Sequence, residues 1–311
     1  AQKYFIEAKK KNSRFILDNF ISSSLYNWSN LSNNNLYQAS INLKKLDERF
    51  ENLKKIQNVF LNCYFNDQNT NNLFKELIST KNLDFSRYNY FYAAFLANSG
   101  KIKEAKEVIK FALKAHPRNL ILNQYKLDIS KEKSISNFDC KNIDHVIAEI
   151  LYIASNALSS QSIYPLSNFY LNLAKYLNKN FHSFDTLLAE NFYKVENFEE
   201  AKKIYNNLSK KGKAFLWYSS KQLAKIYIQE ENKNFALKIM SKAYNNLDVK
   251  DVYETFDYAK FLKNNEKFKE SIFYYDKVID EVKKNHPLYT QSTDGRGVAY
   301  ERIGEWDKAE K

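Results

Sequence analysis

The chain has 311 residues, of which 44% are hydrophobic, 27% charged and 16% aromatic, and its formal net charge is +12. It contains only five Gly and three Pro, although average usage would supply about 22 and about 16. Sandwiches, barrels and doubly wound folds depend on Gly and Pro in their turns and loops, whereas turns between helices also accept Asn, Ser and Lys. The composition therefore excludes those classes and predicts an all-α protein.

The positive charge is concentrated in the first half of the chain. Residues 1–145 hold 23 basic and 14 acidic side chains, and residues 146–311 hold 25 and 22. The excess includes a cluster near the N-terminus: Lys9, Lys10, Lys11 and Arg14. A basic surface can attract nucleic acid, anionic lipid or an acidic protein. It can equally serve solubility alone, so the charge does not choose a partner.

Helical periodicity starts weakly and then becomes clear. Apolar residues recur at intervals of three and four in residues 56–81, and the fit to a helical hairpin is marginal in residues 1–47. The first clear hairpin lies in residues 85–117, where Gly100 marks the turn and Pro117 closes the unit. We therefore expect paired helices from this point onward.

Residues 130–144 interrupt the pattern. They follow a helical stripe from Leu120 to Leu127, but they have no stripe of their own and many turn-forming residues. We expect a linker or irregular loop here, where a half-repeat lacks its second helix. The chain is thereby predicted to comprise a degenerate N-terminal array (1–129), the linker and a C-terminal array (145–311).

The C-terminal array has the most regular spacing. A small residue opens each second helix, at intervals of 35, 35 and 38 residues: Ala201, Ala236, Ser271 and Ala309. The longer interval contains an insertion around Pro287. The hairpin in residues 146–180 is weaker, and its Pro165 lies where a first-turn proline of a second helix is expected.

These hairpins resemble the tetratricopeptide repeat, a pair of helices of about 34 residues. Small residues would let the two helices approach closely: Ala189, Ala224, Ala259 and Gly297. Large residues would fill the space between neighbouring hairpins: Phe198, Phe268 and Trp306. The resemblance implies a right-handed α-solenoid of roughly eight hairpins that bury a continuous core by stacking.

The stretch from Gly295 to Glu310, GRGVAYERIGEWDKAE, is similar to a signature of large bacterial tetratricopeptide proteins that is common in alphaproteobacteria. The resemblance implies a fragment whose repeats continue beyond residue 311 and whose sequence also lacks residues before Ala1. Such proteins often carry an export signal, so both the bacterial cytoplasm and the cell envelope or periplasm stay open as locations.

Motifs for catalysis and metal binding are scarce. The sequence has no glycine-rich phosphate loop, no His-Glu-x-x-His and no Cys-x-x-Cys. Cys63 and Cys140 match no metal or redox spacing, and we interpret them as free buried thiols. One cluster offers four ligand types: Asp139, Cys140, Asp144, His145 and Glu149. Zinc usually takes more thiolate or imidazole than this, so we expect no catalytic residue, cofactor or metal site.

In a tetratricopeptide superhelix the first helix of each hairpin lines a concave groove, so the resemblance implies a binding surface there. Its outward positions combine lysines with aromatic residues: Tyr193, Tyr218, Lys221, Lys225, Tyr253, Phe256, Lys260 and Lys263. Such a set suits an acidic or C-terminal peptide segment. Lys221 and Lys225 match only part of the chaperone-type carboxylate clamp. The lysines can also be a solvated face without a ligand.

The sequence therefore predicts a non-catalytic scaffold that binds a protein or peptide, and no apolar run approaches the roughly 18 residues of a transmembrane segment. Two alternatives are a nucleic-acid binder using the basic first half, and the docking arm of an enzyme whose catalytic region lies outside this chain. Repeat proteins that read RNA place similar polar residues at equivalent helix positions. Here those positions share no chemistry: Thr186, Lys221, Phe256 and Asp294. This favours protein binding.

Overall fold

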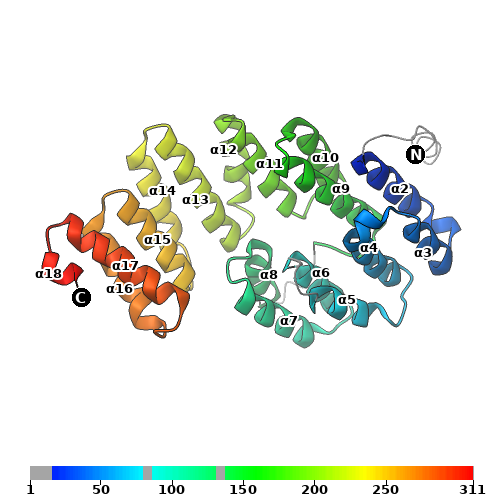
Figure 1. The fold of residues 1–311 in the computed structure, drawn as a ribbon, viewed down its shortest axis with the longest axis horizontal. Coiled ribbons are helices and arrows are strands. Elements are labelled where there is room, and N and C mark those ends of the chain that lie inside the picture. The colour runs from blue at the N-terminus through cyan, green and yellow to red at the C-terminus, as the bar shows by residue number, and fades with distance from the viewer. Residues whose placement is uncertain (1–15, 80–85, 131–136, 311) are drawn as a thin grey trace. The chain divides into compact units, whose positions relative to one another are not determined.

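The computed structural model describes residues 16–79, 86–130 and 137–310, and these residues form helices and short connections without any strand (Figure 1). The all-α prediction is confirmed. The chain divides into two compact units, residues 1–204 and residues 205–311. The basic cluster predicted near the N-terminus lies outside the described residues.

The first unit contains the helices that precede the boundary and the beginning of the helix that crosses it. They are α2 (Ile16–Ser29), α3 (Leu36–Lys44), α4 (Glu51–Tyr64), α5 (Thr70–Ser79), α6 (Ser86–Asn98), α7 (Ile102–Ala115), α8 (Leu120–Ser130), α9 (Ile143–Ser160), α10 (Tyr164–Leu177), α11 (Ser183–Lys194) and α12 (Phe198–Leu208), with 3-10 turns at Leu31–Asn33 and Glu48–Phe50. One hydrophobic core runs through this unit from Phe20 to Leu188.

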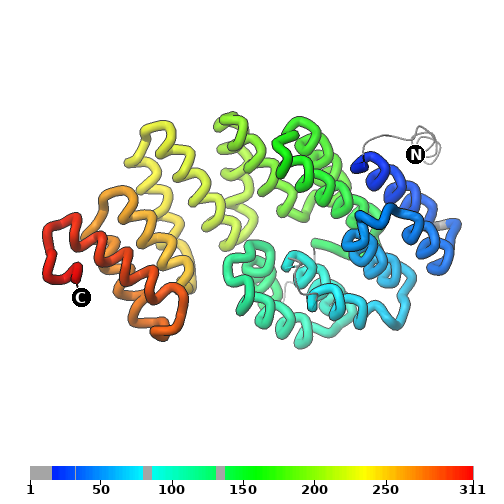
Figure 2. The backbone as a smooth tube through the Cα atoms, viewed as in Figure 1, coloured from blue at the N-terminus to red at the C-terminus, as the bar shows by residue number. Residues whose placement is uncertain are grey.

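The second unit is a succession of hairpins, visible as paired tubes in Figure 2. Its helices are α13 (Lys213–Gln229), α14 (Lys233–Asn245), α15 (Val252–Asn264), α16 (Phe268–Glu281), α17 (Pro287–Arg302) and α18 (Trp306–Ala309). Each helix packs mainly on its neighbours in the chain. The hairpins α13/α14, α15/α16 and α17/α18 are those that the regular spacing of small residues predicts.

The turns inside the hairpins explain how a chain with five glycines forms so many of them. One residue in each turn adopts the left-handed conformation, which glycine reaches without steric cost. Gly100 and Gly304 do so here, but Glu196, Glu231 and Glu266 take the same place with φ of 59°, 59° and 64°. The next amide then donates to a carbonyl near the helix end, at 2.7 to 3.0 Å, as in a Schellman motif: Lys101, Asn197, Asn232, Lys267 and Glu305.

Close approach of helices depends on small residues at the crossing points. Ala189, Ala224 and Ala259 are fully buried. In α17 the close contact falls on Gly295, because a Cβ there would lie 2.5 Å from the ring of Tyr275 in α16. A Cβ at the predicted position, Gly297, would meet only the carbonyl oxygen of Ala309, at 3.4 Å.

The two cysteines correct the sequence interpretation. Both are buried, as predicted, but they are not free thiols, because Cys63 and Cys140 form a disulfide with a Cα–Cα distance of 5.9 Å. The bond joins the last turn of α4 to the segment before α9, across 77 positions of sequence. Spacing could not reveal the pair, since the fold brings together segments that are distant along the chain.

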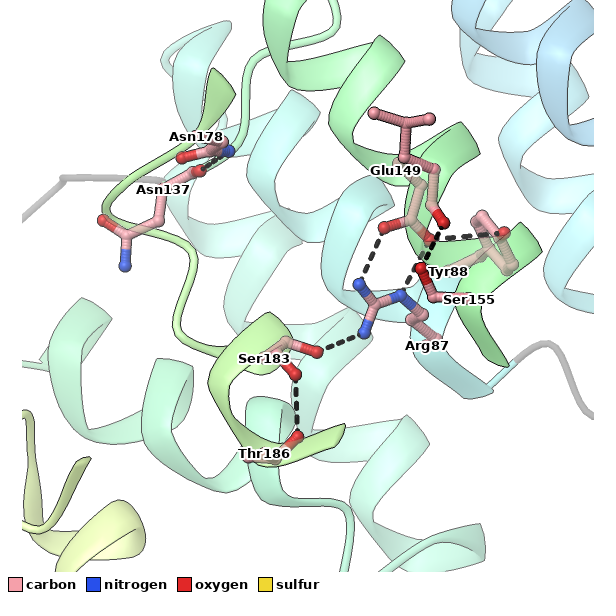
Figure 3. A network of polar contacts seen from close by, with 9 residues as sticks. Arg87, Tyr88, Asn137, Glu149, Ser155, Asn178, Ser183 and Thr186 are labelled. Carbon is pink, nitrogen blue, oxygen red and sulfur yellow. Dashed lines mark hydrogen bonds and ion pairs between the residues drawn. The ribbon is translucent and has the colours of Figure 1, made fainter. Parts of the chain in front are cut away.

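Of the predicted linker, Ser130 is the last residue of α8, and residues 137–144 are packed into the first unit. Phe138 is buried, and its ring centroid lies 4.2 Å from that of Phe91 in α6. The amide of Asn137 donates to the hydroxyl of Tyr90, at 3.1 Å, and the side-chain amide of Asn178 donates to the Asn137 carbonyl, at 2.8 Å (Figure 3). The middle of the linker, residues 131–136, lies outside the described residues.

A buried ion pair links α6 to α9, and a hydrogen bond of the same arginine links α6 to α11. Arg87 of α6 donates from Nε and Nη2 to the two carboxylate oxygens of Glu149 in α9, both at 2.7 Å, and from Nη1 to the hydroxyl of Ser183 in α11 (Figure 3). Its guanidinium carbon lies 3.8 Å from the ring centroid of Tyr152. Burial raises the pKa of the Glu149 carboxyl, and the charge of Arg87 counteracts that rise.

These contacts explain why the boundary between the two compact units does not fall at the predicted linker. The ion pair and the contact between α2 and α9 (Figure 1) join residues on both sides of the predicted linker, and the disulfide joins Cys140, inside that linker, to α4. Helices α9 to α11 therefore belong to the first unit. The boundary falls at residues 204 and 205, inside α12.

Candidate functional site

Seven of the eight predicted binding residues lie in the second unit, on the first helices of its first two hairpins. Tyr218, Lys221 and Lys225 are on α13, and Tyr253, Phe256, Lys260 and Lys263 are on α15. The eighth, Tyr193, is on α11 in the first unit, where its ring packs 5.7 Å from that of Phe198. The candidate site is therefore built from α13 and α15 alone.

An ion pair bridges these two helices. The Lys221 ammonium donates to Oδ2 of Asp257 in α15 at 2.7 Å and lies 5.7 Å from the ring of Trp217. Both charged side chains are partly buried, with 33% and 18% exposed. This ion pair thus joins α13 to α15. Because Asp257 neutralises its charge, Lys221 positions the two helices and is a positioning residue for this face.

The remaining lysines provide the positive charge of the face. Lys225 on α13 and Lys260 on α15 are exposed, and Lys263 is half-buried. Within the described ranges, neither Lys260 nor Lys263 forms an ion pair. These side chains extend from two adjacent helices, so they place positive charge along a strip rather than at a point.

The aromatic residues divide into two groups. Tyr218 and Tyr253 are half-buried: the ring of Tyr218 packs edge-on against Tyr205, and that of Tyr253 against His286. Phe256 is only 5% exposed and lies in a buried cluster with Tyr275 of α16 and Leu288 of α17. Phe256 therefore presents no ring to a ligand, because Tyr275 of its own hairpin and Leu288 of the next one cover it.

Two acidic residues of this face were not singled out by the sequence reasoning. Asp257 is the partner of Lys221, and Glu254 lies one turn earlier on α15. Burial, and then the nearby Asp251 carboxylate, raise the pKa of Glu254 to about 7. The signal for Glu254 was present as Asp251-x-x-Glu254, the pattern of a capping box, which the structure forms in full at the start of α15.

The side chains considered for metal binding have other roles. Cys140 is in the disulfide, Glu149 is paired with Arg87, and the Asp139 amide donates to Nδ1 of His145 at 3.0 Å. Across residues 16–79, 86–130 and 137–310, no group of three or more His, Cys, Asp or Glu residues is arranged to hold an ion. His286 caps α17 by accepting from the Leu288 amide at 3.2 Å.

Within the same described ranges, none of the helices combines the length and the apolar character needed to cross a bilayer.

Comparisons with known proteins agree with a helical repeat and go no further than the fold. No family model matches the chain, and no curated protein matches it. Among solved structures, it is similar to YrrB, a TPR protein with an unusual peptide-binding site, at 18% identity and a TM-score of 0.36, covering 52% of this chain and 80% of that one.

Two further structures are similar over most of the chain. NprR in complex with its cognate peptide NprX has 16% identity and a TM-score of 0.39, covering 85% of this chain and 89% of that one. A tetratricopeptide repeat protein from Parabacteroides merdae has 11% identity and a TM-score of 0.34, covering 84% and 99%. The fold is a helical repeat of the tetratricopeptide type. Its own hairpins show this, through their spacing and their small residues at the crossings.

Proposed function

We propose that this protein is a non-catalytic scaffold whose second unit binds an extended acidic peptide along α13 and α15. The observation that carries the proposal is the strip of exposed lysines, Lys225 and Lys260, on two helices that the Lys221–Asp257 pair holds side by side. An extended segment with carboxylates one helix spacing apart could engage both ammonium groups. Tyr218 and Tyr253 would contact its apolar side chains.

The geometry of this face favours a peptide over a nucleic acid. A repeat that reads bases needs equivalent polar side chains free in successive repeats. Of the equivalent residues considered above, Phe256 is buried, Lys221 is paired, and the Thr186 hydroxyl donates to the Ser183 carbonyl at 2.7 Å. A regular base-reading pattern therefore has no support on these helices.

The test is charge reversal at the two exposed lysines in the full chain. A panel of fluorescein-labelled decapeptides rich in Asp and Glu, with and without Phe, is titrated by anisotropy. The Lys225→Glu/Lys260→Glu variant should weaken capture at least tenfold, about 1.4 kcal/mol. The matched control is Lys238→Glu/Lys269→Glu, which makes the same charge change at exposed positions on the second helices of the same hairpins.

Equal losses in both variants would show that only net charge matters. Unchanged binding in the Lys225→Glu/Lys260→Glu variant would exclude this face. A single-stranded RNA oligonucleotide in the same assay distinguishes the nucleic-acid alternative, whose affinity should fall steeply between about 50 and 200 mM salt.

The disulfide bears on where such a scaffold works. Disulfides persist in oxidising compartments and are rare in the cytosol. The Cys63–Cys140 pair therefore favours the cell envelope over the cytoplasm. Alkylating the protein in denaturant at the moment of lysis tests this, since free thiols are then modified whereas a bonded pair resists modification until a reductant is added.

A further inference from the structure

The first unit contains a second surface that the proposed peptide face does not use. A cavity of about 410 Å³ lies between α7 and α8. The described residues that line it all come from these two helices: Lys106, Ile109, Lys110, Leu113, Lys126, Ile129 and Ser130. The cavity is therefore a groove between two neighbouring helices of one unit.

The chemistry of the groove is apolar at its base and basic at its rim. Ile109 and Ile129 are almost fully buried and Leu113 is half-buried, so they form the base. Lys106 and Lys110 on α7 and Lys126 on α8 are exposed around it. Among the residues that the structure describes, no carboxylate lines the groove and none of the three ammonium groups has an acidic partner. An occupant should then be apolar on one side and acidic at its margins.

The position of the groove in the repeat indicates the shape of that occupant. Helix α8 packs on α6 and α7 as the first helix of a hairpin would, but twelve residues (131–142) separate it from α9. Of these, residues 137–142 are not helical and pack elsewhere in the unit. Second helices such as α7 and α14 have 14 and 13 residues, more than this whole interval contains.

The second unit shows what covers this place in an intact repeat. Tyr244 of α14 lies eight residues after the small residue Ala236, as Leu113 of α7 lies eight residues after Ala105. The ring of Tyr274 in α16 packs on Tyr244, at a centroid distance of 5.3 Å, and also on Tyr258 of α15, at 4.9 Å. A second helix thus closes the groove between α14 and α15. The α7–α8 groove has no counterpart of α16 in the described residues.

We propose that the α7–α8 groove binds an amphipathic, acidic α-helix of a partner protein, which takes the place of the missing second helix. Its apolar stripe would cover Ile109, Leu113 and Ile129, in the manner of helix-in-groove recognition. Glu or Asp residues along its margins would meet Lys106, Lys110 and Lys126. This site is independent of the peptide face on α13 and α15, because it uses other residues, another unit and a helical rather than an extended ligand.

The probe is a fluorescein-labelled 16-residue peptide with Leu at positions i, i+3, i+4 and i+7 and Glu at the flanking positions. Two reference peptides accompany it: a scrambled sequence of the same composition, and a version with Lys in place of Glu. The full oxidised chain should bind the first peptide at least tenfold more tightly than either reference.

Two variants locate the binding. Lys110→Glu/Lys126→Glu should weaken it at least tenfold. The control Lys103→Glu/Lys114→Glu places the same charge change at exposed positions of α7 that do not line the groove, and it should leave binding within about twofold. Because all four positions are exposed, far-ultraviolet circular dichroism should show the same helix content in both variants.

Several outcomes would overturn the proposal. Equal binding of the scrambled peptide would reduce the effect to charge alone. Equal loss in both variants would remove the groove from the explanation. Binding weaker than about 1 mM, or binding of oleate or single-stranded RNA in preference to the helical peptide, would show that the groove does not receive a helix. Lysines on α13 and α15 are intact in all of these proteins, so failure here leaves the proposed peptide face untouched.

Discussion

The two units differ in how far apart in the sequence their contacting residues lie. In the second unit each helix finds its partners among its neighbours in sequence, as repeat architectures do. In the first unit sequence neighbours also pack together, but further contacts join residues that are distant in sequence: 77 positions for the disulfide, 62 for Arg87 with Glu149 and 96 for Arg87 with Ser183. Where the repeat pattern degenerates, covalent and ionic links between distant helices accompany the stacking of hairpins.

The two units should differ in how their stability is distributed. A regular array distributes its stability over similar local interfaces, so a local change should have a local cost. A unit joined by a few distant links should respond to the loss of one link throughout. The predictions below test this contrast in descending order of expected effect.

Loss of the disulfide should have the largest effect, and only in the first unit. The chain-entropy relation for a loop of 77 residues gives a destabilisation of about 4 kcal/mol. Hydrogen exchange of the full chain, with and without reductant, should show lost protection in α4, α6 and α9 and unchanged protection in α13 to α17. The Cys63→Ala/Cys140→Ala variant should reproduce the pattern without reductant. Equal losses in the two units would contradict the contrast.

Removal of the buried positive charge of Arg87 should have the second-largest effect on stability. Arg87→Met leaves the Glu149 carboxyl buried without its partner, at a cost of about 3 kcal/mol in urea unfolding at neutral pH. The cost should shrink at acid pH. Without Arg87 the carboxyl has a pKa above its unfolded value, and stability is then lost as pH rises through that pKa.

The control for this prediction is Arg87→Met/Glu149→Met, which removes both charges. It should recover most of the lost stability, because an apolar pair can replace a buried ion pair. Failure of the double variant to recover would mean that the contacts of Arg87 with Ser183 and the aromatic rings matter more than its charge.

In the second unit, replacing Gly295 at the α16–α17 crossing should have a local effect on stability. Gly295→Ala places a Cβ against the buried ring of Tyr275 and should cost about 2 kcal/mol through overpacking. Gly297→Ala, in the same helix, meets no such ring and should be neutral or gain up to about 1 kcal/mol from helix propensity. Thermal unfolding of both variants checks this, and equal effects would remove the close contact as the cause.

A smaller effect should follow from Glu254, whose pKa is raised to about 7. A raised folded-state pKa stabilises fully below the unfolded value near 4.5, and this contribution is lost as pH rises through about 7. Since the side chain is partly exposed, solvent screening reduces the effect to on the order of 1 kcal/mol. Glu254→Gln keeps an acceptor for the Asp251 amide.

This variant should therefore match the wild type near pH 5 and exceed it in stability near pH 8. Unfolding midpoints in urea at the two pH values measure the difference. A constant difference at both would mean that the carboxyl does not titrate in this range.

The sequence predicts the regular part of the fold well, for a physical reason. Helical spacing of apolar residues and small residues such as Ala236 report local packing, which is what α13 to α17 use. Cys63 with Cys140 and Arg87 with Glu149 could not be paired in this way, because their meeting depends on how the chain folds back. The sequence also gave no reason to choose Gly295 over Gly297, since the crossing point depends on where the Tyr275 ring lies.

The candidate site was predicted only at the level of helix faces. Projection on a helix placed Lys225, Lys260 and Phe256 on the outward face; the two lysines are exposed, but α16 and α17 bury Phe256. It could not show that Lys221 is neutralised by Asp257 from the adjacent helix. Whether the exposed lysines bind a peptide stays a prediction.

The disulfide has a mechanical consequence. When the ends of the molecule are pulled apart, force passes from Cys63 to Cys140 through the sulfur atoms, and the chain between them bears no tension. The disulfide therefore keeps 77 residue steps from being stretched. Fully extended, they would span roughly 250 Å, and they include α5 to α8. Under load, the α7–α8 groove would therefore keep its shape until the bond is reduced, while the hairpins of α13 to α17 lengthen one after another.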